Sequence, residues 1–129
     1  MKNIFKAGDT KTFTKKVTEE DTAKFQSGKV HNLYSTFALG RDVEWCTRLF
    51  VLDMKEEDEE GIGTFLQIEH ISPAKLDSEI IISGVVDSIN GNSLVCRFEA
   101  RVGERLIAKG KTGQKVIKKN KLEKIFEML

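Results

Sequence analysis

The spacing of apolar and polar residues changes several times along the chain, and each change marks an element. From Thr10 to Thr18, apolar residues alternate with Lys and Thr, which predicts a short strand at or near a sheet edge. A hydroxyl and three acids at Thr18–Asp21 then resemble a helix start, and Ser27–Gly28 interrupts the pattern soon afterwards. We therefore expect a short helix or turn between the strand and residue 28.

The segment from about Ser35 to Met54 predicts one long helix. Its apolar side chains cover more than one face of a helical wheel, so we expect a helix buried on several sides. Gly40 inside it lowers helix stability relative to alanine, which indicates that another backbone passes close by. The acidic run Glu56–Glu60 is interpreted as a solvated loop that closes this helix.

The remainder of the chain predicts a run of strands and a terminal helix. Asn90–Gly91 and Gly103–Glu104 have the composition of tight turns, and the segment between them alternates most regularly between apolar and polar residues. The apolar residues of the tail have helical spacing, which predicts a short amphipathic helix. The expected strands are 65–71, 79–89, 93–102 and 105–117, and the expected helix lies within Lys118–Leu129.

This order of elements predicts a single α+β domain over residues 1–129, with a curved antiparallel sheet wrapped around one long central helix. That is the plan of the hotdog fold. The main alternative is the cone-shaped α+β fold of small isomerases and dehydratases, which usually begins with helices. Because a strand comes first here, the pattern favours the hotdog fold.

Composition and charge exclude several function classes. The 129 residues include 21 Lys and Arg against 20 Asp and Glu, so no global field favours nucleic acid. The first residues lack the apolar stretch of a signal peptide, and no run is long enough to cross a bilayer. We expect a cytoplasmic protein without a membrane partner, in which Cys46 and Cys96 are reduced and buried.

Four residues at distinctive spacings are candidates for chemistry. Thr36 opens the long helix, and Glu44 follows eight residues later between apolar neighbours, where burying an acid would be costly. Gly63 precedes a strand that carries His70 seven residues on. Each also has a structural interpretation: Thr36 as a helix cap, Glu44 as a paired or solvated acid, Gly63 as part of a turn, and His70 as a hydrogen-bonded core histidine.

Taken together, these residues resemble the fluoroacetyl-CoA thioesterase type of hotdog enzyme. In that family a Thr at the start of the central helix, a Glu two turns along it, and a Gly and then a His on the next strand build the site. The resemblance extends over nearly the whole chain, including His70–Pro73. It implies an acyl-CoA substrate and no metal or other cofactor, since CoA is part of the substrate. The implied residues are Thr36, Glu44 and His70 for catalysis, and Gly63, Phe37 and Leu39 for binding the substrate.

The resemblance also implies roles for the three catalytic residues. His70 would act as the base, Glu44 would orient it or attack the carbonyl, and Thr36 would hold the water or take part in acyl transfer. Covalent and direct-water routes both stay open at this point. Arg101, Arg105, Lys109 and Lys111 are candidates for binding the CoA phosphates, although a charged strand face is also explained by solvation.

Two departures from the family pattern bear on the substrate. Val30 stands where the family has a bulky gating aromatic residue, and Pro73–Leu76 lacks the glycine expected before the next strand. The sequence therefore predicts hydrolysis of ordinary small to medium acyl thioesters. A homodimer or a dimer of dimers is expected, because a sheet wrapped on one helix leaves edges to cover.

Two alternative functions share this fold. A hydratase or dehydratase acting on acyl-CoA would also use a His and an acid, but its usual His-Phe-Pro-Gly signature is absent here. A non-catalytic module that binds acyl-CoA would have no need for Thr36, Glu44 and His70 together. Release of free CoA from an acyl-CoA separates the thioesterase from both alternatives.

Overall fold

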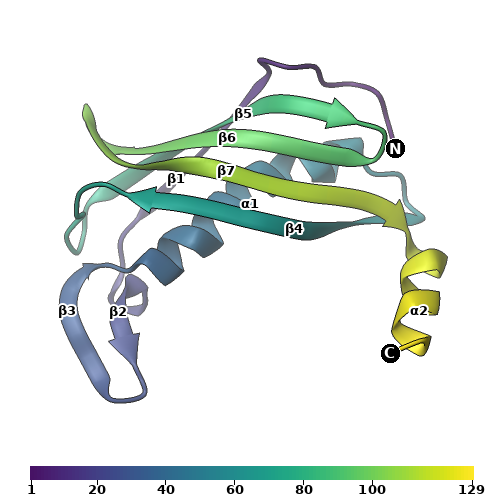
Figure 1. The fold of residues 1–129 in the computed structure, drawn as a ribbon. Helices are drawn as coiled ribbons and strands as arrows, with labels where there is room; N and C mark the ends of the chain where they lie inside the picture. The colour runs from purple at the N-terminus through teal and green to yellow at the C-terminus, as the bar shows by residue number, and fades with distance from the viewer.

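The computed structural model describes residues 1–129 and consists of a five-stranded antiparallel sheet, a two-stranded hairpin and two helices. The long helix α1 (Thr36–Met54) lies against one face of the sheet, which curves over it (Figure 1). No helix is long and apolar enough to cross a membrane. The strands of the sheet, in spatial order, are β1 (Thr10–Lys16), β5 (Glu79–Asn90), β6 (Ser93–Val102), β7 (Arg105–Lys118) and β4 (Glu59–His70).

The predicted meander is confirmed in β5, β6 and β7. Asn90 lies opposite Ser93, and Val102 lies opposite Arg105, so each connection is a two-residue turn. Gly91 and Gly103 have φ values of 59° and 58°, in the left-handed region that glycine adopts without strain. The terminal helix α2 (Lys119–Glu127) follows β7 as the spacing of the tail predicts.

The core lies between α1 and the inward side chains of the sheet. One cluster forms around Leu39, Val43 and Phe98, and a second around Phe50 and Leu94. Between them a buried polar group joins helix to sheet: the Thr47 hydroxyl accepts hydrogen bonds from Thr112 (2.9 Å) and Gln114 (3.2 Å). Both cysteines are free and buried, and burial raises the pKa of Cys46 to about 11.

The segment after β1 differs from the prediction. A single turn of 3-10 helix, η1 (Glu19–Asp21), is followed by a hairpin of β2 (Thr22–Phe25) and β3 (Gly28–Tyr34). Gly28, with a φ of 113°, lies at the turn of this hairpin. The predicted helix start at Thr18–Asp21 is therefore confirmed only for this single turn. The hairpin was not predicted, because most of β2 and β3 is exposed on both faces and their residues show no period-two alternation.

The acidic run after α1 is only partly a loop. β4 begins at Glu59, and the Glu59 carboxylate is buried, where it accepts a hydrogen bond from the Glu56 amide and lies 2.7 Å from the amino group of Met1. A buried carboxylate with these partners belongs to the fold and not to a solvated surface.

Helix α1 is less buried than its composition predicts. The side chains of Phe37, Trp45 and Leu52 are 85%, 43% and 39% exposed, so one face of the helix lacks a cover within the chain. Gly40 also differs from expectation: a Cβ there would lie 3.2 Å from the Leu66 side chain, so side chains of β4, and not a backbone, approach it.

An ionic cluster ties the hairpin to the start of α1. Asp21 is 1% exposed and accepts hydrogen bonds from Arg41 (2.7 Å) and Lys15 (2.9 Å). Burial alone would raise the pKa of the Asp21 carboxyl, but its hydrogen bonds, led by the one from Arg41, hold that pKa well below the usual range. Asp42 completes the cluster by accepting from Arg41 and from the Tyr34 hydroxyl.

Replacement of Asp21 by asparagine is expected to lower the free energy of unfolding by about 2 kcal/mol at pH 7, because Arg41 and Lys15 lose a buried partner. A depressed carboxyl pKa stabilises the fold above the unfolded-state value of about 4 and stops doing so as the pH falls through the folded-state value. Urea unfolding should therefore show the full difference at pH 7 and a smaller one at pH 3. The exposed neighbour provides the control: Glu20→Gln should change little at either pH, and an Asp21→Asn loss that persists undiminished at pH 3 would contradict the assignment.

Candidate active site

Thr36 and His70 form a direct contact at the junction of α1 and β4. The hydroxyl Oγ1 of Thr36 lies 2.9 Å from Nδ1 of His70, the last residue of β4. Ser35, and not Thr36, caps the helix, because its Oγ accepts a hydrogen bond from the Ala38 amide at 2.9 Å. The interpretation of Thr36 as a helix cap is therefore wrong, and its hydroxyl is available to the histidine.

The surroundings of His70 favour the neutral form of its imidazole. Burial lowers its pKa, and this outweighs the opposite effect of a backbone hydrogen bond at Ser72. Its second nitrogen, Nε2, is buried and has no hydrogen-bond partner in the chain. A buried polar atom without a partner is uncommon, and it marks the place where a substrate or water could bind.

Glu44 lies two turns after Thr36 and faces β4. Its Oε1 would be 3.2 Å from a Cβ at position 63, so Gly63 allows the carboxylate to approach the strand. A register irregularity between Gly63 and Phe65 lies at the same place. Within the single chain the Glu44 side chain is exposed, in contrast to the burial that its apolar neighbours suggest.

Two clefts meet at the start of α1. The larger one, about 1010 Å³, lies between the hairpin and His70, and the smaller one, about 470 Å³, lies between α1 and β4 and includes Glu44. Thr36 and Phe37 line both clefts. His70 lines only the larger cleft and Glu44 only the smaller one, and the two side chains form no hydrogen bond with each other.

The remaining predicted substrate residues differ in their positions. Phe37 is 85% exposed and stands at the mouth of both clefts, whereas Leu39 is fully buried in the core and lines neither. The sequence did not single out Arg41, which lines the smaller cleft and belongs to the ionic cluster. Its position one turn before Glu44 on the same helix face is the signal that could have found it.

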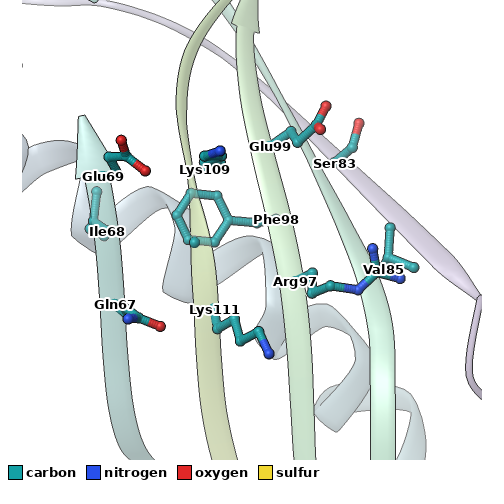
Figure 2. Close-up of a pocket in the computed structure, with 11 residues that line it drawn as sticks. Gln67, Ile68, Glu69, Ser83, Val85, Arg97, Phe98, Glu99, Lys109 and Lys111 are labelled. Carbon is teal, nitrogen blue, oxygen red and sulfur yellow. The ribbon is translucent and has the colours of Figure 1, made fainter. Parts of the chain in front are cut away.

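A third cleft, of about 560 Å³, opens on the face of the sheet turned away from α1 (Figure 2). It contains none of the residues Thr36, Glu44 and His70. Arg97 and Lys111 lie 3.1 and 3.7 Å from the carboxylate of Asp87, so much of its charge is paired across strands. Among the basic candidates for phosphate binding, Arg105 donates a hydrogen bond of 2.7 Å to the hydroxyl of Ser72, two residues after His70.

The comparisons with known proteins agree on one family. A family model described as fluoroacetyl-CoA-specific thioesterase (FlK) matches residues 17–120. A hypothetical protein of Thermus thermophilus, described as a thioesterase superfamily member, is 30% identical, with a TM-score of 0.92 over 98% of this chain and 93% of that one. No curated protein matched this chain.

Two further solved structures share the fold at lower identity. The fluoroacetyl-CoA thioesterase FlK is 17% identical, with a TM-score of 0.89 over 98% of both chains. A hot-dog-like protein from Thermanaerovibrio acidaminovorans is 22% identical, with a TM-score of 0.87 over 97% of this chain and 93% of that one. Their agreement with the topology described above confirms the predicted hotdog architecture.

The pKa of His70 can be measured directly, because the chain contains only two histidines, His31 and His70, and their signals are easily told apart. An NMR titration of the imidazole protons should place the His70 pKa below the ordinary value of about 6.5, since burial disfavours its charged form. His31→Ala leaves a single imidazole signal and so assigns both. A His70 pKa at or above 6.5 would contradict the buried, unpartnered position of its Nε2.

Proposed function

The chain belongs to the fluoroacetyl-CoA-specific thioesterase family and is a thioester hydrolase, and we propose that it hydrolyses small to medium acyl-CoA thioesters to free acid and CoA. The observation that carries the proposal is the contact of Thr36, which lines both clefts, with a half-buried His70 whose pKa is lowered by burial. A hydroxyl beside an uncharged imidazole is the pair that general-base catalysis requires near neutral pH.

The two tautomers of His70 correspond to two hydrolytic routes. If Nδ1 carries the proton and donates to Thr36 Oγ1, the lone pair of Nε2 is free to take a proton from water, which attacks the carbonyl carbon. If Thr36 donates to Nδ1, the hydroxyl itself is activated for acyl transfer. In both routes the C–S bond then breaks and the CoA thiolate receives the proton that His70 has accepted. In the acyl-transfer route the acyl group is then an ester on Thr36, and a water molecule deprotonated by His70 cleaves this ester, which releases the acid and returns the proton to Thr36 Oγ1.

The start of α1 supplies partners for the developing negative charge. The first amides of a helix have no intrahelical acceptor, and the helix dipole favours an anion beside them. Phe37 occupies this first turn and lines both clefts. The carbonyl oxygen of the thioester is proposed to bind here, with Glu44 across the smaller cleft to orient a water or to attack the carbonyl.

Substitution of the three residues tests the site. His70→Ala and Glu44→Ala should each lower kcat by about 10²- to 10³-fold, and Thr36→Val by less, because each removes a group that acts on the reacting atoms. CoA release from acetyl-CoA and longer acyl-CoAs, followed with a thiol-trapping reagent, measures the effect. His31→Ala is the matched control, since His31 also lines the larger cleft but makes no contact with Thr36.

The double variant sharpens this test. Groups that act as one unit are not additive, so the Glu44/His70 double substitution should be little worse than the worse single one. Thermal unfolding of each variant separates catalysis from stability. Stable single variants with near-normal turnover would rule out this site.

Val30 bears on the choice of acyl group. It lies on the hairpin, is 60% exposed, and lines the larger cleft with a side chain much smaller than an aromatic gate. A cleft of about 1010 Å³ with such an opening has no feature that selects fluorine. We expect the kcat/KM values for fluoroacetyl-CoA and acetyl-CoA to agree within about tenfold, a difference of about 1.4 kcal/mol. A preference of several orders of magnitude for fluoroacetyl-CoA would contradict this.

Strand β4 supports the proposal of a homodimer. It forms one edge of the sheet over twelve residues, and its middle, Ile62–Ile68, carries no charge. Phe65 and Leu66 are 44% and 41% exposed there. The opposite edge, β1, has only seven residues, of which three are lysines, a composition that discourages pairing. If two copies joined through β4, the unpaired backbone N–H and C=O groups of this edge would form hydrogen bonds, and the apolar side chains there would be covered.

Sedimentation velocity at micromolar concentration should therefore show a species of twice the 14.6 kDa chain mass. Phe65→Asp should shift the distribution toward monomer, because it places a charge on the paired edge. Thr12→Asp also introduces an acid, but on the β1 edge, and should leave the dimer intact. A wild-type protein that sediments only as monomer would overturn the dimer.

A further inference from the structure

Helix α2 has an apolar face that its own chain does not cover. Ile125, Phe126 and Leu129 are 42%, 63% and 96% exposed, and no residue of the helix is buried. Together with Leu122 they have the spacing of one helix face. A nine-residue helix is not stable by itself in water, so its order depends on a surface that packs against this face.

The position of α2 prevents it from reaching the cleft of its own chain. Lys118 pairs with Glu59, the first residue of β4, and the Lys119 amide donates to Asp58 at 2.8 Å. His70 lies at the other end of this strand, which spans about 36 Å at ~3.3 Å per residue. The nine residues of α2 extend only about 14 Å.

In a dimer joined through β4, α2 can reach the cleft of the other chain. A strand that pairs with its own copy about a two-fold axis normal to the sheet must run antiparallel to it, so the Glu59 end of one β4 lies beside the His70 end of the other. Figure 1 shows α2 near the Glu59 end of β4 and the hairpin of β2 and β3 near the other end of the strand. A two-fold axis at the middle of β4 exchanges these two ends, and it therefore brings α2 close to the hairpin of the partner subunit.

The two surfaces that meet have matching chemistry. Four apolar side chains at the mouth of the larger cleft are exposed in the single chain. The adjacent η1 adds the exposed acids Glu19 and Glu20, which pair with Lys29 and Lys24 of the same hairpin at 2.8 and 3.8 Å. The polar side of α2 carries Lys119, Lys121 and Lys124. The exposed apolar residues of the cleft are Phe25 (70%), Val30 (60%), Phe37 (85%) and Ile71 (46%).

We propose that α2 of each protomer packs on the hairpin of β2 and β3 in a second copy of this chain and closes the larger cleft of that copy. Each acyl site is then built from two chains: Thr36 and His70 come from one, and the apolar face of α2 comes from the other. The inference rests on the proposed thioesterase site and β4 dimer. It assigns to α2 a role in binding the acyl group, and not in the chemical step.

Heterodimers of two tagged chains test whether α2 acts across the interface. The double substitution Ile125→Ser and Phe126→Ser removes the apolar face, and His70→Ala silences a site. With these changes on different chains, the one working site faces an intact α2 and should keep the wild-type KM. With both changes on one chain, the working site faces the altered α2, and its KM for a medium-chain acyl-CoA should rise about tenfold with little change in kcat.

The reverse pattern, or equal KM values in the two heterodimers, would overturn the proposal. Glu123→Gln, on the polar side of α2, is the matched control and should have no effect in either arrangement. Wild-type turnover is measured in parallel, and its absence would count against the thioesterase site itself and not against the position of α2.

A cross-linking experiment needs no activity. Chains with Val30→Cys and chains with Phe126→Cys, mixed and treated with a short bis-maleimide, should give a covalent dimer on a denaturing gel, since Cys46 and Cys96 are buried. Glu123→Cys in place of Phe126→Cys should give much less. A dimer in sedimentation without the Val30–Phe126 cross-link would overturn the proposal while leaving the β4 dimer in place.

Discussion

The hydrogen bond between Thr36 and His70 is the contact on which the proposed active site depends, because it joins the first turn of α1 to the last residue of β4. The two residues are 34 positions apart. Each end is fixed by its own backbone bonds: Ser35 donates to the Asp21 carbonyl, and the amides that follow His70 donate to Ile107. The imidazole is thus held against the hydroxyl by the fold and not by local chain geometry.

Charge is buried where the hairpin meets this helix start. Asp21 and Asp42 lose their solvation there, and Arg41, Lys15 and Tyr34 supply the hydrogen bonds that make the burial tolerable. The same Arg41 lines the cleft that holds Glu44. The cluster therefore stabilises the fold and also sets the position of the hairpin over the larger cleft.

Three surfaces of the single chain remain uncovered: the Trp45 face of α1, the edge of β4 and the apolar side of α2. Each is unfavourable in water by itself. The proposed dimer accounts for the β4 edge and, through α2, for the open mouth of the larger cleft.

The sequence by itself determined the elements whose pattern is local: α1, the meander of β5 to β7 with its glycine turns, and α2. It also indicated Thr36, Glu44 and His70 through their spacing. Only the tertiary structure decided that Ser35 caps the helix, that Leu39 belongs to the core, and that β2 and β3 pair. The physical reason is that periodicity reports a residue's own face, whereas burial and hydrogen bonding depend on which distant segment packs there.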